Sequence, residues 1–241
     1  MIKLELFTEE KNNTKLAKSQ DSPYRSIGLF LSPHRENNLR VNLCPNASQA
    51  CIASCLNTAG LAGVYPTILK ARKRKSNEFL ADRIGFVDRL KKEIEVYKRR
   101  TPKGRKLVVR LNGTSDIDFT RYDIFNSFPN TQFYDYTKSP QRMSKFLCGN
   151  LPKNYHLTFS FSGENLIECQ NVLRGGGSVA TVFSGGLPTH WQGYEVIDGD
   201  ITDLRFLDKQ NVVVGLKAKG KAKNSVLAGS FVIQIDRMKG K

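Results

Sequence analysis

The chain has 241 residues, of which 39% are hydrophobic and 25% are charged, and these are the proportions of an ordinary globular protein. This length suits one large domain without disulfide bonds, because single cores stop growing at roughly 250–300 residues. No apolar stretch approaches the roughly 20 residues that span a bilayer, and the N-terminal run MIKLELFTEEKNNTK lacks the apolar segment of a signal peptide. The composition therefore excludes a helical membrane protein and predicts a cytoplasmic one.

The net charge of +16 is concentrated in one part of the chain. Between Lys70 and Lys106, fifteen Lys or Arg residues stand against five acidic residues, so this segment contributes +10 of the total. Such a field attracts polyanions, and nucleic acid is the commonest polyanion inside a cell. The segment predicts nucleic-acid binding, and the alternative is a solvated helical face that only aids solubility.

The first half of the chain divides into an arm, a loop and a basic helical segment. Residues 1–25 are expected to form an N-terminal strand and a polar arm, and residues 26–241 a single α/β domain with a cysteine loop at 32–65 and a basic helical segment at 66–106. Pro66 is suited to the first position of a helix. Apolar residues then recur at three- and four-residue steps, which predicts one buried helical face: Phe79, Leu80, Ile84, Val87, Leu90, Ile94 and Tyr97.

Short apolar strands then alternate with helices. The expected strands are 26–31, 107–111, 132–136, 156–161, 178–183, 194–197 and 211–216, and the expected helices are 120–128, 139–148 and 164–173. This alternation predicts an α/β protein with a parallel sheet covered by helices. About six such units predict an open or partial (β/α) barrel with the cysteine-rich loop after its first strand, and a doubly wound open sheet is the alternative. A last strand at 230–236 is expected to pair antiparallel at an edge.

Three of the five cysteines, Cys44, Cys51 and Cys55, lie within twelve residues. Six residues separate the first two and three separate the last two, so a helical turn would present Cys51 and Cys55 on one face. In a reducing cytoplasm this grouping indicates metal ligation or redox chemistry rather than disulfides. Three converging thiolates suit a 4Fe–4S cluster with a non-cysteine fourth ligand. The alternatives are zinc, for which no second ligand pair exists, and three buried cysteines that act as small hydrophobic residues.

Cys148, Cys169 and His34 are the other candidate ligands. Cys148 ends an expected helix and Cys169 lies on an apolar helical face, so both are expected in the core. His34 precedes the cysteine loop and could reach a cluster, but a lone loop histidine is usually solvated. The cluster is therefore assigned to Cys44, Cys51 and Cys55.

Polar residues follow the ends of the expected strands, where the loops of an α/β barrel carry its chemistry. Asp116 follows the strand at 107–111, and Asp135 and Lys138 lie where the strand at 132–136 opens into its loop. Carboxylates with perturbed pKa values are frequent in active sites. These three residues are the catalytic candidates, although many polar residues at strand ends only cap the next helix.

Nucleic-acid contacts are expected from the basic helical segment and from a later alternating run. The candidates are Arg72, Lys73, Arg74, Lys75, Lys98, Arg99, Arg100, Lys217, Lys219 and Lys221. If the run LKAKGKAKN were extended, its ammonium groups would lie along one side, which matches the phosphates of a nucleic-acid strand. The alternative for this run is a flexible solvated loop.

Seven motifs follow one another along the chain: NLCPNASQACIASCLNTAG, ARKRKSNEFLADRIGFVDRLKKEI, VRLNGTSDID, FYDYTK, NYHLTFSFSGEN, VIDGDITDLRFLD and VVVGLKAKGKA. This series, over most of residues 26–223, resembles the gene-product-88-like proteins of bacteriophages and plasmids. The resemblance implies a phage-type protein in the cytoplasm of an infected bacterial host, with a metal centre in the cysteine loop. The layout is also similar to that of radical S-adenosylmethionine enzymes, which have a three-cysteine loop after the first strand of a partial barrel. Their cysteines are separated by three and then two residues, whereas these are separated by six and then three.

Three functions are consistent with these features. The first is a phage-type 4Fe–4S protein that binds or acts on nucleic acid. The second is a redox or radical enzyme whose cluster has an open iron site for a small molecule such as S-adenosylmethionine. The third is a metal-dependent nuclease that uses Asp116, Asp135, Asp198 and Asp200 with Mg²⁺.

Overall fold

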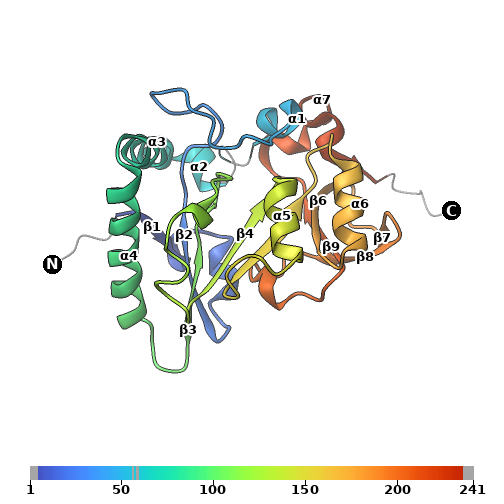
Figure 1. Ribbon diagram of the computed structural model, residues 1–241. Coiled ribbons are helices and arrows are strands. Elements are labelled where there is room, and N and C mark those ends of the chain that lie inside the picture. The colour runs from blue at the N-terminus through green and yellow to red at the C-terminus, as the bar shows by residue number, and fades with distance from the viewer. Residues whose placement is uncertain (1–4, 56, 58–59, 236–241) are drawn as a thin grey trace.

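The computed structural model describes residues 5–55, 57 and 60–235, and in this part of the chain ten strands form one open sheet (Figure 1). The strands are β1 (Phe7–Glu9), β2 (Tyr24–Leu29), β3 (Lys106–Arg110), β4 (Gln132–Thr137), β5 (Tyr155–Ser160), β6 (Val179–Ser184), β7 (His190–Trp191), β8 (Tyr194–Asp198), β9 (Val213–Lys217) and β10 (Val232–Gln234). The α-helices are α1 (Gln49–Ala53), α2 (Leu61–Val64), α3 (Pro66–Ala81), α4 (Arg83–Arg99), α5 (Pro140–Leu147), α6 (Leu166–Arg174) and α7 (Ser225–Ala228). Among the described residues, no helix has the length and apolar character needed to cross a membrane.

The strand order is β1-β2-β3-β4-β5-β6-β9-β8-β7, with β10 paired to β6 outside this path. Neighbouring strands from β2 to β8 in this order are parallel, whereas β1 and β7 are antiparallel to their neighbours. The mixed α/β class is therefore confirmed, and the sheet is not closed. The last strand does not pair antiparallel at an edge as expected, because β10 returns through α7 and runs parallel to β6, with Val232 opposite Val182.

Fewer α-helices connect the strands than the alternating pattern suggested. The expected helix at 120–128 is a short 3-10 helix (Phe119–Arg121) followed by turns, and Phe119, Phe125 and Phe128 of this segment are all buried in the core. Another 3-10 helix (Arg205–Leu207) lies in the connection from β8 to β9. In addition, β9 lies between β6 and β8, so the last parallel strands do not follow chain order. The described residues therefore do not form six regular strand–helix units.

The basic helical segment is two helices rather than one. Asp82 has extended backbone angles (φ −146°, ψ 92°), and its carboxylate accepts the N–H of Gly85 at 2.9 Å, which ends α3 and caps α4. This break rotates the apolar face, so Ile84 is 64% exposed although the uninterrupted pattern would bury it. Leu90 and Ile94 of α4 are fully buried against the sheet, as predicted.

The two faces of the sheet are covered differently. Helices α4, α5 and α6 lie along one face, and their apolar residues form the large core with β2 to β6 (Figure 1). The other face is covered by the segment before β9, where Leu204 packs on Val108 and Tyr134. The N-terminal arm reaches this segment, since Lys15 Nζ lies 3.1 Å from a carboxylate oxygen of Asp203. The arm and the segment before β9 thus meet on the face of the sheet opposite these helices.

One buried polar group gives a stability prediction. Thr158 is fully buried, and its hydroxyl has no hydrogen-bond partner in the described part of the chain. Thr158→Val keeps the shape and removes this unpaired group, so we expect the free energy of unfolding to rise by about 1 kcal/mol in urea titrations. Thr137→Val is the matched control, because Thr137 Oγ1 accepts hydrogen bonds from Ser139 N and Arg142 Nη2. Thr137→Val should lower the free energy of unfolding by about 1–3 kcal/mol. A lower free energy of unfolding in Thr158→Val would contradict the prediction.

Candidate functional site

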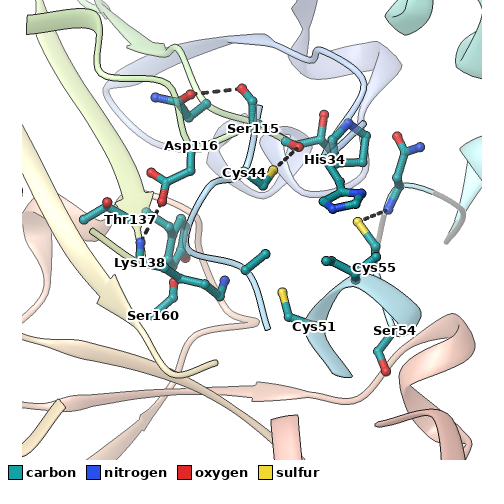
Figure 2. Close-up of a pocket in the computed structure, with 18 of the residues that line it drawn as sticks. His34, Cys44, Cys51, Ser54, Cys55, Ser115, Asp116, Thr137, Lys138 and Ser160 are labelled. Atoms are coloured by element: carbon teal, nitrogen blue, oxygen red, sulfur yellow. Dashed lines mark hydrogen bonds between the residues drawn. The ribbon is translucent and has the colours of Figure 1, made fainter. Parts of the chain in front are cut away.

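The three clustered cysteines line one cavity of about 200 Å³, here called the cysteine cavity. Its walls come from the segments that follow the carboxyl ends of the parallel strands β2, β3, β4 and β5 and from residues within β6 and β9. In such sheets this end is the usual place of a binding site. Figure 2 shows the sulfur atoms of Cys44, Cys51 and Cys55 turned toward a shared space. The structure therefore brings together the three residues that the sequence grouped.

Hydrogen bonds position each cysteine. Cys51 lies in α1, whose capping residue Ser48 accepts the Cys51 N–H at 3.1 Å and donates to the carbonyl of Ser162 beyond β5. The Cys44 thiol donates to the Thr114 carbonyl, with a sulfur–oxygen distance of 3.7 Å. Cys55 lies beyond the end of α1, so one helical turn does not carry both thiols as expected, although both line the cavity.

Buried Arg72 supports the position of Cys55. Its Nη1 donates to the side chain of Asn57 at 2.6 Å and to the Asn57 carbonyl at 3.0 Å. The backbone N–H of Asn57 in turn donates to the Cys55 sulfur, with a nitrogen–sulfur distance of 3.5 Å. Asn57 Nδ2 also donates to Glu36 at 2.7 Å. This chain of contacts links α3 to the cysteine cavity.

The electrostatic environment of the thiols is unusual. Burial raises the pKa of Cys44 to about 12 and also raises the pKa of Cys55. Removal from water lowers the pKa of Lys138, but the surrounding thiols and the Asp116 carboxylate more than offset this, so the net shift is upward. Without a bound cation the thiols of Cys44 and Cys55 are therefore protonated, and a ligated metal would have to displace their protons.

A single metal ion would require the three thiols to lie closer together than a cluster would. In the part of the chain that the structure describes, no three His, Cys, Asp or Glu side chains form a group that could hold a metal ion. Tetrahedral zinc, with each sulfur at about 2.3 Å, would need thiolates only about 3.8 Å apart. Zinc and a larger cluster therefore differ in how closely the three thiolates must approach one another.

The other residues considered as ligands are placed as follows. Cys169 is fully buried in α6, as predicted, but Cys148 is exposed at the end of α5 and is not a core residue. The helix ends there because the chain turns at Gly149, which has a positive φ of 70°. His34 lines the cysteine cavity instead of extending into solvent. Its ring lies near Cys44 and Cys55 (Figure 2).

Asp116 lines the cysteine cavity but is already paired. One of its carboxylate oxygens contacts Arg142 Nη2, and the other accepts the backbone N–H of Lys138 at 2.9 Å. Arg142 is only 4% exposed, which makes the ion pair a buried link between the loop after β3 and helix α5. Asp116 therefore positions Lys138, whose side chain lines the same cavity.

Asp135 is fully buried and is not among the residues that line the cavity. Its carboxylate accepts the Asn112 N–H at 2.7 Å, the Asn112 side-chain amide at 3.0 Å and the Tyr155 hydroxyl at 3.0 Å. Side chains alternate across a strand, and Asp135 faces the helical side while Tyr136 faces the cavity. The structure thus places Asp135, a catalytic candidate from the sequence, among structural contacts outside the cysteine cavity.

Asp135 should also make stability depend on pH. Burial raises its pKa from 3.8 to about 6, despite the opposing hydrogen bonds from Asn112. The folded protein then binds this proton more readily than the unfolded chain, so stability from this group is present below about pH 4 and is lost as pH rises through 6. We expect the difference in unfolding free energy between wild type and Asp135→Asn to fall by on the order of 3 kcal/mol from pH 4 to 7. A difference that is flat or rises with pH would contradict this.

The carboxylates of the nuclease hypothesis do not form one site. Asp198 pairs with Lys217 at 2.9 Å and Asp200 with Lys219 at 2.5 Å, at the ends of β8 and β9. Asp116 and Asp135 have the separate partners described above. Lys217 and Lys219 are thus committed to ion pairs, and Lys221 lies in a 3-10 helix (Gly220–Lys223) rather than in an extended run. The structure gives no support to a row of ammonium groups on one side.

Two of the predicted nucleic-acid contacts are buried. Arg72 is 8% exposed and Lys75 is 5% exposed, because both lie on the side of α3 that packs on the interior. Lys75 Nζ donates to the Leu6 carbonyl at 2.9 Å, and burial lowers the pKa of Lys75 to about 8. Neither residue is part of the exposed surface, so these two predictions were wrong.

The remaining basic candidates lie on separate surfaces. Lys98, Arg99 and Arg100 are exposed at the end of α4, beside the amino ends of the strands, since Arg25 near the start of β2 donates to the Arg100 carbonyl at 2.8 Å. This end is opposite the end of the molecule where α1 lies (Figure 1), and α1 carries Cys51 of the cysteine cavity. Arg74 pairs with Glu78 at 2.6 Å, and Lys73 is exposed on α3.

Lys73 belongs to a basic groove beside the cysteine cavity. This groove has a volume of about 540 Å³, and four exposed cations line it: Arg35, Arg40, Lys70 and Lys73. Glu36 and Asn57 line both the groove and the cysteine cavity. Within the described residues, no carboxylate lies within 4.0 Å of Arg40, Lys70 or Lys73. Three unpaired cations therefore lie next to the wall that contains Cys55.

The sequence did not point to Lys15 and Arg110, which line the cysteine cavity from its inner side. Arg110 is the last residue of β3 and is 7% exposed. A charged residue that ends an otherwise apolar strand was the available signal, since arginine is almost never buried unless it is paired. Lys15 comes from the N-terminal arm, and nothing local in the sequence indicates its position.

One family model matches most of the chain. The family model described as Gene product 88 matches residues 6–230, a range that contains β1 to β9 and the three cavity cysteines. No curated protein and no solved structure matches the chain. The similarity to radical S-adenosylmethionine enzymes is not confirmed by these comparisons. The chain belongs to the Gene product 88 family.

Proposed function

We propose that the protein is a 4Fe–4S protein that binds nucleic acid on the side of the molecule where the cluster lies. The observation that carries this proposal is the placement of Cys44, Cys51 and Cys55 around one cavity at the carboxyl ends of parallel strands. A cuboidal cluster takes each thiolate on a different iron, so its ligands surround a space rather than meet at a point. Three cysteines leave one iron for a different ligand, and His34 lines the same cavity.

The local charge supports a cluster in this position. Thiols in apolar surroundings resist ionisation, and iron supplies the positive charge that makes thiolates stable there. Lys138 lines the cavity beside the thiols and provides a further positive charge. When bound, the cluster supplies electron transfer or an open iron coordination position. The chain holds the cluster with Cys44, Cys51 and Cys55 and keeps Lys138 in place through Asp116.

We further propose that the sheet is a partial barrel. The successive order of β2 to β6 is that of a singly wound barrel, whereas a doubly wound sheet reverses its order near the middle. The N-terminal arm and the segment before β9 occupy the side that a barrel would enclose. The cysteine cavity then lies at the mouth of this barrel.

The basic groove is the surface that best suits nucleic acid. Its unpaired cations Arg40, Lys70 and Lys73 are free to displace counterions from a phosphate chain, which is the main source of such affinity. Because Glu36 and Asn57 border both sites, a bound strand would lie next to the cluster. Loss of the cluster would then release Cys55 and alter one wall of the groove.

A redox or radical enzyme is the second candidate, and one observation favours it. The cysteine cavity continues past the thiols to Tyr136 and Arg110, so a small molecule has space beside an open iron. S-adenosylmethionine added to the reduced protein should then change the cluster spectrum. An unchanged spectrum and no reductive cleavage would dismiss this candidate for that molecule.

Anaerobic purification followed by iron and sulfide analysis tests the proposed function. We expect a brown protein with near-equal iron and sulfide and broad visible absorbance that bleaches on reduction. A colourless, iron-free protein under oxygen-free conditions would overturn the proposal. Zinc in place of iron would overturn it equally.

A further inference from the structure

The inner end of the cysteine cavity contains a buried arginine that its neighbours only partly satisfy. Arg110 Nη1 lies 3.0 Å from a carboxylate oxygen of Asp203, which is fully buried. The Nε–H of Arg110 has no hydrogen-bond partner among the residues that the structure describes. Arg110 is 7% exposed and lines the cavity. Buried donors are nearly always paired. Among the described arginines with an unpaired Nε–H, which are Arg72, Arg105, Arg110, Arg142 and Arg205, Arg110 alone lines the cysteine cavity.

A second cation shares the same carboxylate. Lys15 Nζ lies 3.1 Å from the other oxygen of Asp203 and 3.4 Å from the Tyr136 hydroxyl. The Tyr136 ring lies between the two cations, 4.7 Å from Lys15 Nζ and 4.8 Å from the Arg110 guanidinium carbon. Lys15 and Arg110 line the cavity, whereas the carboxylates of Asp203 and Asp135 do not. This end of the cavity therefore presents two cations to the space beside the thiols.

The rest of the inner wall is apolar. It is formed by small and aliphatic residues of β6 and β9 and by two phenylalanines: Ala180, Val182, Leu216, Phe161 and Phe231. An apolar wall with a few charged groups at one end is the usual composition of a small-molecule site. Inorganic ions alone would leave this wall uncovered.

We propose that this part of the cavity binds a small molecule with an anionic head and an apolar body, the head at Arg110 and Lys15 and the body against the wall of β6 and β9. The head is a carboxylate or a phosphate, since a guanidinium and an ammonium recognise both. The site deepens the proposed function, because it would hold this molecule beside the cluster. Its position on the inner side of the thiols means that ligand and cluster share one cavity.

Binding of three ring compounds to the anaerobically purified protein tests the proposal. Benzoate and phenyl phosphate carry the two anionic heads, and benzamide is the neutral counterpart of benzoate. By calorimetry under argon, at least one of the two anions should bind at least ten-fold more tightly than benzamide. Which anion binds more tightly then identifies the head. If neither anion binds at millimolar concentration, or if benzamide binds equally well, the proposal is overturned.

Variants locate the site. Arg110→Gln and Lys15→Gln should each weaken binding of the anion at least ten-fold and leave benzamide unchanged. Lys15 is 31% exposed, so its variant should fold even if the loss of Arg110 beside buried Asp203 does not permit folding. Arg121→Gln is the matched control, because Arg121 is exposed and lies outside the cavity. Equal weakening in Arg121→Gln, or none in Lys15→Gln, would contradict the assignment.

Iron and sulfide are measured on the same samples. A sample without iron that still discriminates benzoate or phenyl phosphate from benzamide would refute the cluster and keep the anion site. A brown sample that fails to discriminate would keep the cluster and refute the anion site. The two proposals therefore fail separately.

Discussion

Cys44→Ser, Cys51→Ser and Cys55→Ser are each expected to lower the iron content of the anaerobically purified protein to a small fraction of the wild-type value. Each removes one thiolate from the cysteine cavity, and a serine hydroxyl is a harder and far less acidic ligand. Loss of a direct ligand should exceed the roughly 10–100-fold effect of an outer-shell change on metal affinity. Iron and sulfide analysis with the visible spectrum measures the loss.

Cys148→Ser is the matched control for these three variants. Cys148 is exposed at the end of α5 and does not line the cysteine cavity, so its replacement should leave iron, sulfide and colour unchanged. Cys169 is less suitable, because it is fully buried and a polar substitute would disturb the core. If Cys148→Ser lost as much iron as the cavity variants, the assignment of ligands would be wrong. If only one of the three cavity variants lost iron, a three-cysteine cluster would be excluded.

Replacement of Arg40, Lys70 and Lys73 by glutamine is expected to weaken nucleic-acid binding by on the order of 100-fold at low salt. Each neutralised phosphate contributes about 0.9 to the slope of log affinity against log salt for duplex DNA, so the slope should fall by roughly 2–3. Fluorescence anisotropy with labelled single- and double-stranded oligonucleotides over a series of salt concentrations measures both quantities.

The matched control removes the same charge from the opposite end of the molecule. Lys98, Arg99 and Arg100 are exposed at the end of α4, away from the basic groove, and their replacement by glutamine should change affinity and slope much less. A larger loss of affinity in the α4 variant would show that nucleic acid binds to that helix. Wild-type affinity that does not change with salt would refute binding through phosphate contacts altogether.

The elements that the sequence located well are those whose signal is local. The strands β3 to β6 lie within about two residues of their expected ranges, because short apolar runs between turn residues are read from neighbouring positions. The helix from Pro140 to Leu147 begins with a proline after a capping Ser139, and both signals are visible in the sequence. The cysteine spacing likewise indicated which thiols would share a site.

Predictions failed where the deciding contact is distant along the chain. The sequence predicted that Arg72 and Lys75 are surface cations. Both are buried, because their hydrogen-bond partners Asn57 and Leu6 come from other segments of the chain. The sequence predicted that the Asp135 carboxylate opens into the loop after its strand. Its contacts with Asn112 and Tyr155 instead place it on the face of the sheet that the helices cover. The position of β9 between β6 and β8 is also invisible locally, because strand order depends on pairing between remote segments.

The sequence by itself determined the α/β class, the grouping of Cys44, Cys51 and Cys55, and the excess of positive charge, since composition and spacing are properties of the chain. Only the tertiary structure decided which cations remain exposed and which side chains share a cavity. Arg110 and Lys15 are far apart in sequence, yet both bind Asp203. Burial and charge pairing depend on which distant segments the fold brings within a few ångströms, and that distance is not encoded at any single position.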